Sequence, residues 1–298
     1  RFANFAYVPM PGGAAAVKNP LRMAYGVLWE FDLLEHPGAK EALDALGADA
    51  AEVCDRMIER GLNTPYTSSV GRLFDAASAL LGICTAPTYE GEPAILLEAA
   101  MSDLEAGSAA VEGSATRRSA VQDPSDPSCA ALLQSCDDKN GVQTVAPPST
   151  AADPAGESGL DDQEGASAYR IEVVKNTATP ESTAQDTSVL LLDPESAFRA
   201  LLDDKAAGVP APVIARRFHD AFVQAIADAA ELCRALYGIG TVALSGGVFM
   251  NRYLVEHALQ TLERAGFTVA VNRDLPPNDG CVSYGQAVVA WAANNDNA

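Results

Sequence analysis

One stretch near the carboxyl end of the sequence constrains the fold more than any other. It predicts a buried strand over residues 241–244, a tight turn at 245–247, a helix over 251–265 and a second strand over 267–271. A strand, a helix and a further strand in succession form a βαβ unit, whose two strands lie parallel in one sheet. The chain is therefore predicted to belong to the α/β class, with helices packed on a sheet.

Helical patterns account for most of the remaining patterned sequence. Apolar periodicity, together with flanking proline and glycine residues, predicts helices over 19–31, 39–46, 50–60, 67–83, 92–100, 194–205, 212–237 and 282–293. The stretches "YRIEVV" and "SVLLLD" predict two short strands that pair with each other.

A low-complexity segment interrupts this pattern. Residues 103–168 hold twelve acidic and three basic side chains, and no aromatic residue lies between Tyr89 and Tyr169. Such a composition buries too little apolar surface to offset the entropy lost on ordering. We therefore predict a disordered insertion over 103–168, whose simplest role is that of a solvated linker, and one folded lobe made of residues 1–102 and 169–298.

Charge and cysteine content exclude several classes of protein. Forty acidic side chains against twenty basic ones give a net charge of −20, which repels a phosphate backbone, so nucleic acid is not an expected partner. No apolar run approaches the roughly 18 residues that a membrane-spanning helix needs, so no membrane partner is expected. The six cysteines contain no CxxC pair, and their irregular spacing predicts reduced thiols in a cytoplasmic protein.

Three places could carry chemistry. Gly246 and Gly247 let a ligand approach the backbone, and the free N–H groups of this glycine turn, at the positive end of the following helix, favour an anion or a nucleotide, although such turns are more often simple connections. Asp279, in the stiff "PPNDGC" loop, could coordinate a metal or cap the next helix. Arg72 and Asp75 lie three residues apart on one helix face, where a plain ion pair is the simplest interpretation.

Other catalytic patterns are missing from the sequence. The three histidines show neither HxH nor HxxxH spacing, and we expect His219 and His257 to be ordinary surface or capping residues of helices. Ser245 lacks the GxSxG elbow, and no cysteine has a histidine nearby in the sequence. A hydrolase triad and a histidine-based metal site are therefore not supported.

Six motifs, taken together, resemble one family. In chain order they are "MPGGAAAVKNPLRMA", "NTPYTSSVGRLFDAASALLGI", "YEGEPAILLE", "ARRFHDAF", "LSGGVFMNRYL" and "LPPNDGCVSYGQAVVA". They resemble, in the same order, the carboxy-terminal Kae1-like region of the HypF family, the carbamoyltransferases of NiFe-hydrogenase maturation. The resemblance implies an actin/Hsp70-like ATPase (ASKHA) lobe, with a βαβ-containing sheet and packed helices.

The resemblance also implies a reaction. Carbamoyl phosphate and ATP, with Mg²⁺, would form a carbamoyl-adenylate. The carbamoyl group would then pass to the terminal cysteine of a HypE-like partner protein of hydrogenase maturation, as the precursor of a cyanide ligand. By motif, Gly246, Gly247 and Asn251 would line the adenosine site, Asp75 would lie by the ribose hydroxyls, and Gly91 would form the facing wall.

The same resemblance implies one active-site divalent metal, iron or zinc, with Asp279 as one ligand. The family's histidine ligands belong to a half-domain absent from this sequence, so we expect one lobe of a two-lobed site, part of a longer protein and inactive alone. The sequence departs from the family pattern at Cys281, where a second glycine is usual, and at Met250, where a polar residue is common. Two alternatives stay open: a relative that carbamoylates tRNA threonyl groups or antibiotic hydroxyls, and a non-catalytic Kae1-like binding module.

Overall fold

The computed structural model describes residues 1–102, 169–175 and 190–295. The predicted insertion over 103–168 lies outside the described residues, so its disorder stays a prediction. The described residues on both sides of it belong to one compact unit.

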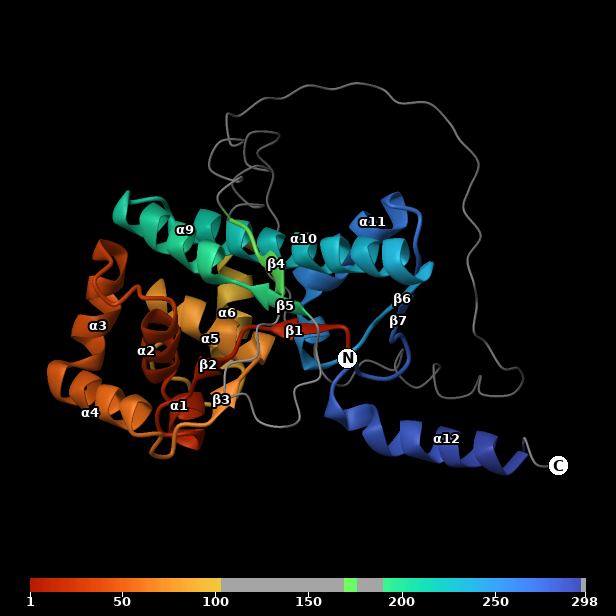
Figure 1. Ribbon diagram of the computed structural model, residues 1–298, viewed down its shortest axis with the longest axis horizontal. Helices are drawn as coiled ribbons and strands as arrows, with labels where there is room; N and C mark the ends of the chain where they lie inside the picture. Colours follow the sequence, from red (N-terminus) through yellow and green to blue (C-terminus); the bar gives the residue numbers. More distant parts are fainter. Residues whose placement is uncertain (103–168, 176–189, 296–298) are drawn as a thin grey trace, which may run out of the picture. The chain divides into compact units, whose positions relative to one another are not determined.

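Each predicted helix is present in the structure (Figure 1). Those before the insertion are α1 (Ala14–Lys18), α2 (Pro20–Glu30), α3 (Lys40–Leu46), α4 (Ala48–Glu59), α5 (Val70–Leu80) and α6 (Glu92–Ala100), with a 3₁₀ turn, η1 (Pro37–Ala39). Those after it are α9 (Glu195–Ala206), α10 (Ala211–Tyr237), α11 (Arg252–Arg264) and α12 (Val282–Asn295), with 3₁₀ turns η3 (Gly247–Met250) and η4 (Asp279–Cys281). The predicted helix ends agree to within three residues, apart from α1, which was not predicted.

The described strands form three small sheets. They are β1 (Ala3–Phe5), β2 (Val8–Pro9), β3 (Tyr66–Thr67), β4 (Glu172–Lys175), β5 (Leu190–Asp193), β6 (Thr241–Leu244) and β7 (Thr268–Val271). β6 and β7 are parallel and joined through α11, which confirms the βαβ unit and the α/β class. β4 and β5 pair antiparallel, as predicted, and β1 adds to β5 in parallel. β2 pairs antiparallel with β3. β1, β2 and β3 were not predicted, because two or three residues are too few to show an alternating pattern.

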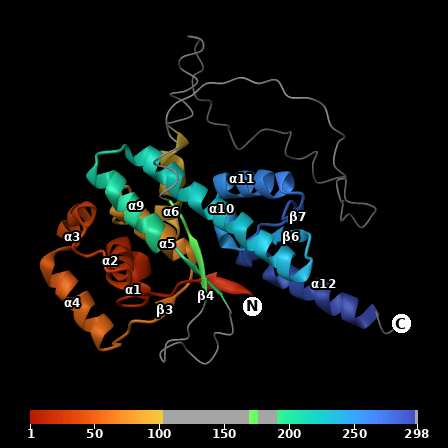
Figure 2. The ribbon, with the colours of Figure 1, turned by 45° about the horizontal axis from the view of Figure 1, so that its top comes forward.

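The main core lies where α2, α5, α9 and α10 meet. Phe218 of α10 has its ring centroid 5.5 Å from that of Phe74 on α5 and 5.2 Å from that of Phe198 on α9. Gly26 lets α2 pass directly beside β2, because a Cβ at this position would overlap the carbonyl oxygen of Pro9. α10 lies beside α9 and α11 (Figures 1 and 2). This long helix therefore connects the main core to the βαβ unit, whose smaller core includes Leu244, Leu262 and Phe267.

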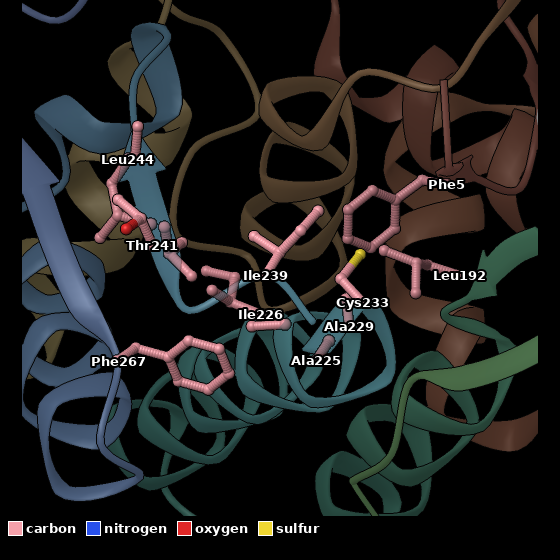
Figure 3. Close-up of a pocket in the computed structure, with 13 residues that line it drawn as sticks. Phe5, Leu192, Ala225, Ile226, Ala229, Cys233, Ile239, Thr241, Leu244 and Phe267 are labelled. Carbon is pink, nitrogen blue, oxygen red and sulfur yellow. The ribbon is translucent and has the colours of Figure 1, made fainter. Parts of the chain in front are cut away.

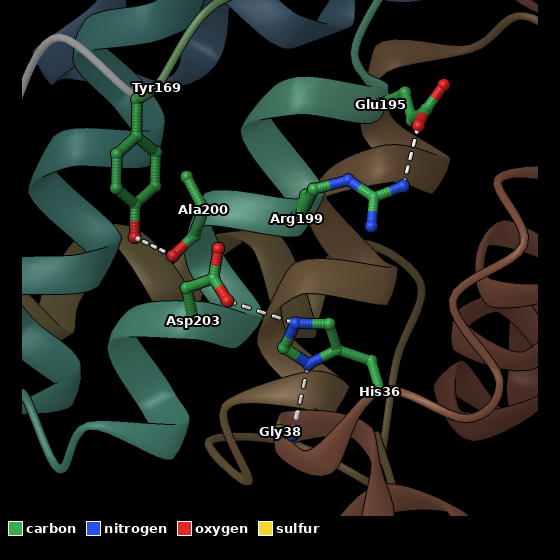
Figure 4. A network of polar contacts seen from close by, with 7 residues as sticks. All are labelled: His36, Gly38, Tyr169, Glu195, Arg199, Ala200 and Asp203. Atoms are coloured by element: carbon green, nitrogen blue, oxygen red, sulfur yellow. Dashed lines mark hydrogen bonds and ion pairs between the residues drawn. The ribbon is translucent and has the colours of Figure 1, made fainter.

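A polar network connects α9 to the segment that follows α2 (Figure 4). His36 Nε2 lies 3.1 Å from Asp203 Oδ1, and His36 Nδ1 accepts a hydrogen bond of 3.1 Å from the Gly38 N–H. The Tyr169 hydroxyl, which comes from the segment before β4, donates to the carbonyl of Ala200 on α9 at 3.3 Å. Segments far apart in the sequence are thus held against α9. None of the described helices combines the length and the apolar composition needed to cross a membrane.

Candidate functional site

The glycine turn after β6 exposes backbone donors. Gly246 has φ 111° and ψ 160°, a conformation that glycine adopts almost alone, and its N–H donates to the Pro277 carbonyl at 2.8 Å. The next two N–H groups, of Gly247 and Val248, find no acceptor within the described part of the chain. They are therefore available to an acceptor outside the chain.

The first N–H groups of α11, by contrast, are already occupied by acceptors within the chain. Asn251 Oδ1 caps the helix by accepting from the Leu254 N–H at 2.9 Å. Glu98 Oε1, on α6, accepts from the N–H groups of Arg252 at 2.8 Å and Tyr253 at 3.1 Å. A protein carboxylate occupies the position that a bound anion would take. In the turn that precedes α11, by contrast, the Gly247 and Val248 N–H groups have no acceptor among the described residues.

The loop that contains Asp279 lies against this glycine turn. Pro277 accepts from the Gly246 N–H, and a Cβ built on Gly247 would lie 3.9 Å from the Asn278 Cβ. Asn278, not Asp279, caps the 3₁₀ turn η4, because the Asn278 side chain accepts from the Gly280 N–H at 3.0 Å.

Asp279 itself is exposed at the start of η4. Across residues 1–102, 169–175 and 190–295, no group of three or more His, Cys, Asp or Glu side chains is placed to hold a metal ion. The described residues therefore do not make a metal centre by themselves. Asp279 can offer at most one ligand to a metal held largely by other groups.

Asp75 is buried in α5 with an incomplete set of partners. Its Oδ2 lies 3.1 Å from Arg72 Nη1, which confirms the predicted ion pair. Its Oδ1 has no hydrogen-bond partner among the described residues, and neither has Arg72 Nη1 or Ser78 Oγ. Burial raises the pKa of Asp75 to about 6, against the opposing effect of Arg72. A buried carboxylate oxygen without a donor fits a ligand that brings hydroxyl groups.

Gly91 lies at the start of α6, next to the helix that carries Asp75. It precedes the first turn with a left-handed φ of 87°. Its neighbour Glu90 reaches Arg72, with Oε1 3.7 Å from Nη2, and α6 packs along α5. Arg72 thus links the Gly91 turn to Asp75.

His219 connects α5 to the start of α11. It is fully buried, so the expectation of a surface or capping residue was wrong. Its ring centroid lies 4.9 Å from that of Phe74, the neighbour of Asp75, and its Nε2 lies 3.0 Å from Asn251 Nδ2. α5 also lies against η3. The elements that carry the predicted residues are therefore neighbours, one after another, from α6 through α5 and η3 to the Asp279 loop.

A separate cavity of about 400 Å³ lies between the β1–β5 pair, α10 and β6 (Figure 3). The side chains around it include Phe5, Leu192, Ile226, Leu244 and Phe267, and no charged residue contributes to it. An anionic substrate would lose its hydration here without gaining a counter-charge. The cavity is therefore a poor candidate for binding phosphate-containing molecules.

The family described as "Carbamoyltransferase, Kae1-like Domain, second subdomain" matches residues 1–148 and 155–286. The chain belongs to the HypF carbamoyltransferase family. Among HypF proteins, it is 30% identical to carbamoyltransferase HypF2 of Cupriavidus necator over 97% of this chain and 30% of that one. It is also 30% identical to a HypF homolog of the same organism, over 97% of this chain and 57% of that one.

Two solved HypF structures share the fold. A full-length HypF in a phosphate- and nucleotide-bound form superposes with a TM-score of 0.67 at 28% identity, over 97% of this chain and 28% of that one. HypF of T. kodakarensis superposes with a TM-score of 0.63 at 23% identity, over 99% of this chain and 30% of that one. The chain spans less than a third of the length of both HypF proteins.

Met250, one departure from the HypF pattern, touches the Asp279 loop. Its Sδ lies 2.9 Å from Asn278 Nδ2, which donates to it. Cys281, the other departure, is half-buried at the end of η4. Both substitutions thus fall where the glycine turn and the loop meet.

Proposed function

We propose that this chain forms the nucleotide-binding part of a carbamoyltransferase active site. The observation that carries the proposal is a set of unpaired polar groups on two neighbouring elements, η3 and α5. Among the described residues, the Gly247 and Val248 N–H groups of the turn have no acceptor, and the buried Asp75 Oδ1 on α5 has no donor. The nucleotide in the related full-length HypF structure is in keeping with this role.

Each predicted residue has a place in the proposed site. Gly246, Gly247 and Asn251 line the adenosine, where glycines leave room for the ligand beside the backbone. Asp75 Oδ1 accepts from a ribose hydroxyl, which would pair the buried oxygen. Gly91, at the start of α6, forms the wall of the site opposite the glycine turn.

The proposed reaction has three steps. Water first hydrolyses carbamoyl phosphate to carbamate and phosphate. A carbamate oxygen then attacks the α-phosphorus of ATP, which forms the C–O–P bond of carbamoyl-adenylate and releases pyrophosphate. The terminal cysteine thiolate of a HypE-like maturation partner then attacks the carbamoyl carbon, and AMP leaves. Mg²⁺ would neutralise phosphate charge, and Asp279 would supply one ligand to an iron or zinc ion whose other ligands come from elsewhere.

The proposed site needs a second wall. The chain spans less than a third of two HypF structures, and the matching family describes a second subdomain. α12 leaves Tyr284, Val289 and Trp291 well exposed, which suits a surface that meets further protein. A site formed by this chain alone would bury less of the nucleotide surface than a complete pocket, which covers roughly 70–90% of a ligand. We therefore expect this chain alone to bind ATP weakly and to turn over no carbamoyl phosphate.

Calorimetry and product analysis test the proposal. ATP with Mg²⁺ is titrated into the chain, and into the chain fused to the first Kae1-like subdomain of a HypF relative. The fusion should bind more tightly and release AMP only when carbamoyl phosphate and a HypE-like thiol acceptor are both present. Nucleotide binding without AMP release in a complete enzyme would indicate a binding module instead. Tight ATP binding and carbamoyl-phosphate-dependent AMP release by the chain alone would contradict the one-wall proposal.

A further inference from the structure

His219 makes a buried contact that the proposed function does not use. Its imidazole on α10 is fully buried, with the Tyr253 ring centroid 5.6 Å away. Nδ1 lies 2.7 Å from the Ala215 carbonyl oxygen, and Nε2 lies 3.0 Å from Asn251 Nδ2. Both ring nitrogens therefore have a partner.

These two partners assign the tautomer of the ring. A backbone carbonyl only accepts, so Nδ1 carries the hydrogen and donates to Ala215. Nε2 then presents a lone pair and accepts from the Asn251 amide. Burial lowers the pKa of His219 to about 4, so the ring is neutral at neutral pH, which is the state that this arrangement requires.

The Asn251 amide is held at both ends. Its Oδ1 accepts from the Leu254 N–H, and its Nδ2 donates one hydrogen to His219. A flipped amide would set a donor against the Leu254 N–H and an acceptor against the Nε2 lone pair, so only one orientation satisfies both contacts. The second Nδ2 hydrogen finds no acceptor within residues 1–102, 169–175 and 190–295.

We infer that His219 is a positioning residue: by accepting from Asn251 Nδ2, it holds the amide so that the second Nδ2–H is presented to an oxygen or ring-nitrogen acceptor of the bound nucleotide. The inference rests on the proposed function for the identity of the ligand. Without the imidazole acceptor the amide can rotate, and about one hydrogen bond to the nucleotide is lost. One such bond corresponds to a roughly five- to tenfold weaker dissociation constant.

Nitrogen NMR of the whole chain tests the inference on three variants. H219Q keeps a hydrogen-bond acceptor and a donor at a similar distance from the backbone. H219L removes both groups and keeps a side chain of similar volume. H257Q is the matched control. His257 Nδ1 contacts the Tyr253 carbonyl at 2.9 Å and is not bonded to Asn251. The readouts are the protonation of the His219 nitrogens, the Asn251 side-chain signals, and their shifts as ATP with Mg²⁺ is added.

We expect a protonated Nδ1 and a bare Nε2 in the wild type. ATP should bind five- to tenfold more weakly to H219L, with recovery in H219Q and no change in H257Q. A protonated Nε2 in the wild type, or equal ATP affinity of H219L and wild type, would overturn the positioning role and leave the nucleotide site standing. A wild-type fusion with the first Kae1-like subdomain that shows no ATP-dependent shift would instead refute the proposed function and, with it, the ligand assigned to Asn251.

A second variant covers the case in which H219L does not fold. N251D keeps an oxygen to cap the Leu254 N–H but cannot donate to His219. The carboxylate is expected to draw a proton onto Nε2 and to weaken ATP binding by a similar factor. Unchanged ring protonation together with unchanged ATP affinity in N251D would overturn the inference.

Discussion

Glu98 on α6 accepts a hydrogen bond of 2.8 Å from the backbone N–H of Arg252, the first residue of α11. The same carboxylate oxygen also accepts from the Tyr253 N–H. A negative charge at a helix N-terminus satisfies two otherwise unpaired donors and interacts favourably with the helix dipole. This contact occupies the first two backbone N–H groups of α11, whereas those of Gly247 and Val248 in the turn have no acceptor among the described residues.

Removing this cap should weaken the fold measurably. We expect E98A to lower the free energy of unfolding by about 1–2 kcal/mol, and E98Q by about half of that, because the amide oxygen still accepts without the charge. Urea unfolding followed by circular dichroism measures both. E256Q is the control, because Glu256 pairs with the exposed Arg252 side chain on the same helix and should change stability by less than about 0.5 kcal/mol. Equal losses in E98A and E256Q would show that the cap contributes nothing.

The two glycines of the turn should respond differently to alanine. Gly246 has a φ of 111°, so G246A is expected to cost about 1–3 kcal/mol of stability even though a Cβ there meets no atom. Gly247 has no positive φ, and its Cβ would make an ordinary contact at 3.9 Å with Asn278, so G247A should fold with nearly unchanged stability. Thermal unfolding of the two variants compares them directly. A G247A variant that is less stable than G246A would contradict the backbone argument.

Asp75 should make the protein less stable as pH rises. Burial raises its pKa from 3.8 to about 6, so between these values the folded chain binds more protons than the unfolded chain. The free energy of unfolding therefore falls as pH rises through this window. D75N removes the buried charge and should be more stable than the wild type by about 3 kcal/mol above pH 7, with no difference near pH 4. Urea unfolding over a pH series measures this. A constant difference at every pH would show that Asp75 does not titrate in that range.

The same substitution should weaken nucleotide binding while it stabilises the fold. An amide at this position offers a poorer acceptor to a ribose hydroxyl than a carboxylate does. We expect D75N to bind ATP about tenfold more weakly, in line with one lost charge-assisted hydrogen bond. Titration of the fusion with the first Kae1-like subdomain provides the measurement. An affinity equal to that of the wild type would remove Asp75 from the nucleotide site.

His219 should have the opposite dependence on pH. Burial lowers its pKa from 6.5 to about 4, with a further contribution from nearby His257, so the folded chain binds fewer protons than the unfolded chain between these values. Stability is therefore lost as pH falls from about 6.5 towards 4, by up to about 3 kcal/mol. In H219Q the free energy of unfolding should fall less over this pH range. The measurement is made in a D75N background, because Asp75 acts in the other direction over the same range. A pH profile that H219Q leaves unchanged would contradict the prediction.

The sequence by itself determined every described helix except α1, together with the βαβ unit and the family, because each shows in local patterns. Apolar residues repeat with the helical period along α10, and the strand β6, the glycine turn and the helix α11 follow each other within one short stretch of the chain. The pairing of β2 with β3 was not readable, because each strand has only two residues and the partners lie far apart in the chain.

Only the tertiary structure decided which polar groups near the turn are occupied. Glu98 reaches Arg252 across 154 residues of sequence, and His219 reaches Asn251 across 32. Neither contact can be predicted from the neighbouring sequence, because a glutamate on α6 and a histidine on α10 have the pattern of ordinary helix residues. Packing brings them to the start of α11. There burial lowers the pKa of His219, its contacts with Ala215 and Asn251 set its tautomer, and the Glu98 carboxylate accepts from the first N–H groups of the helix. The motif therefore predicted the candidate site from the sequence, and the contacts between distant helices determined which of its atoms remain available to a ligand.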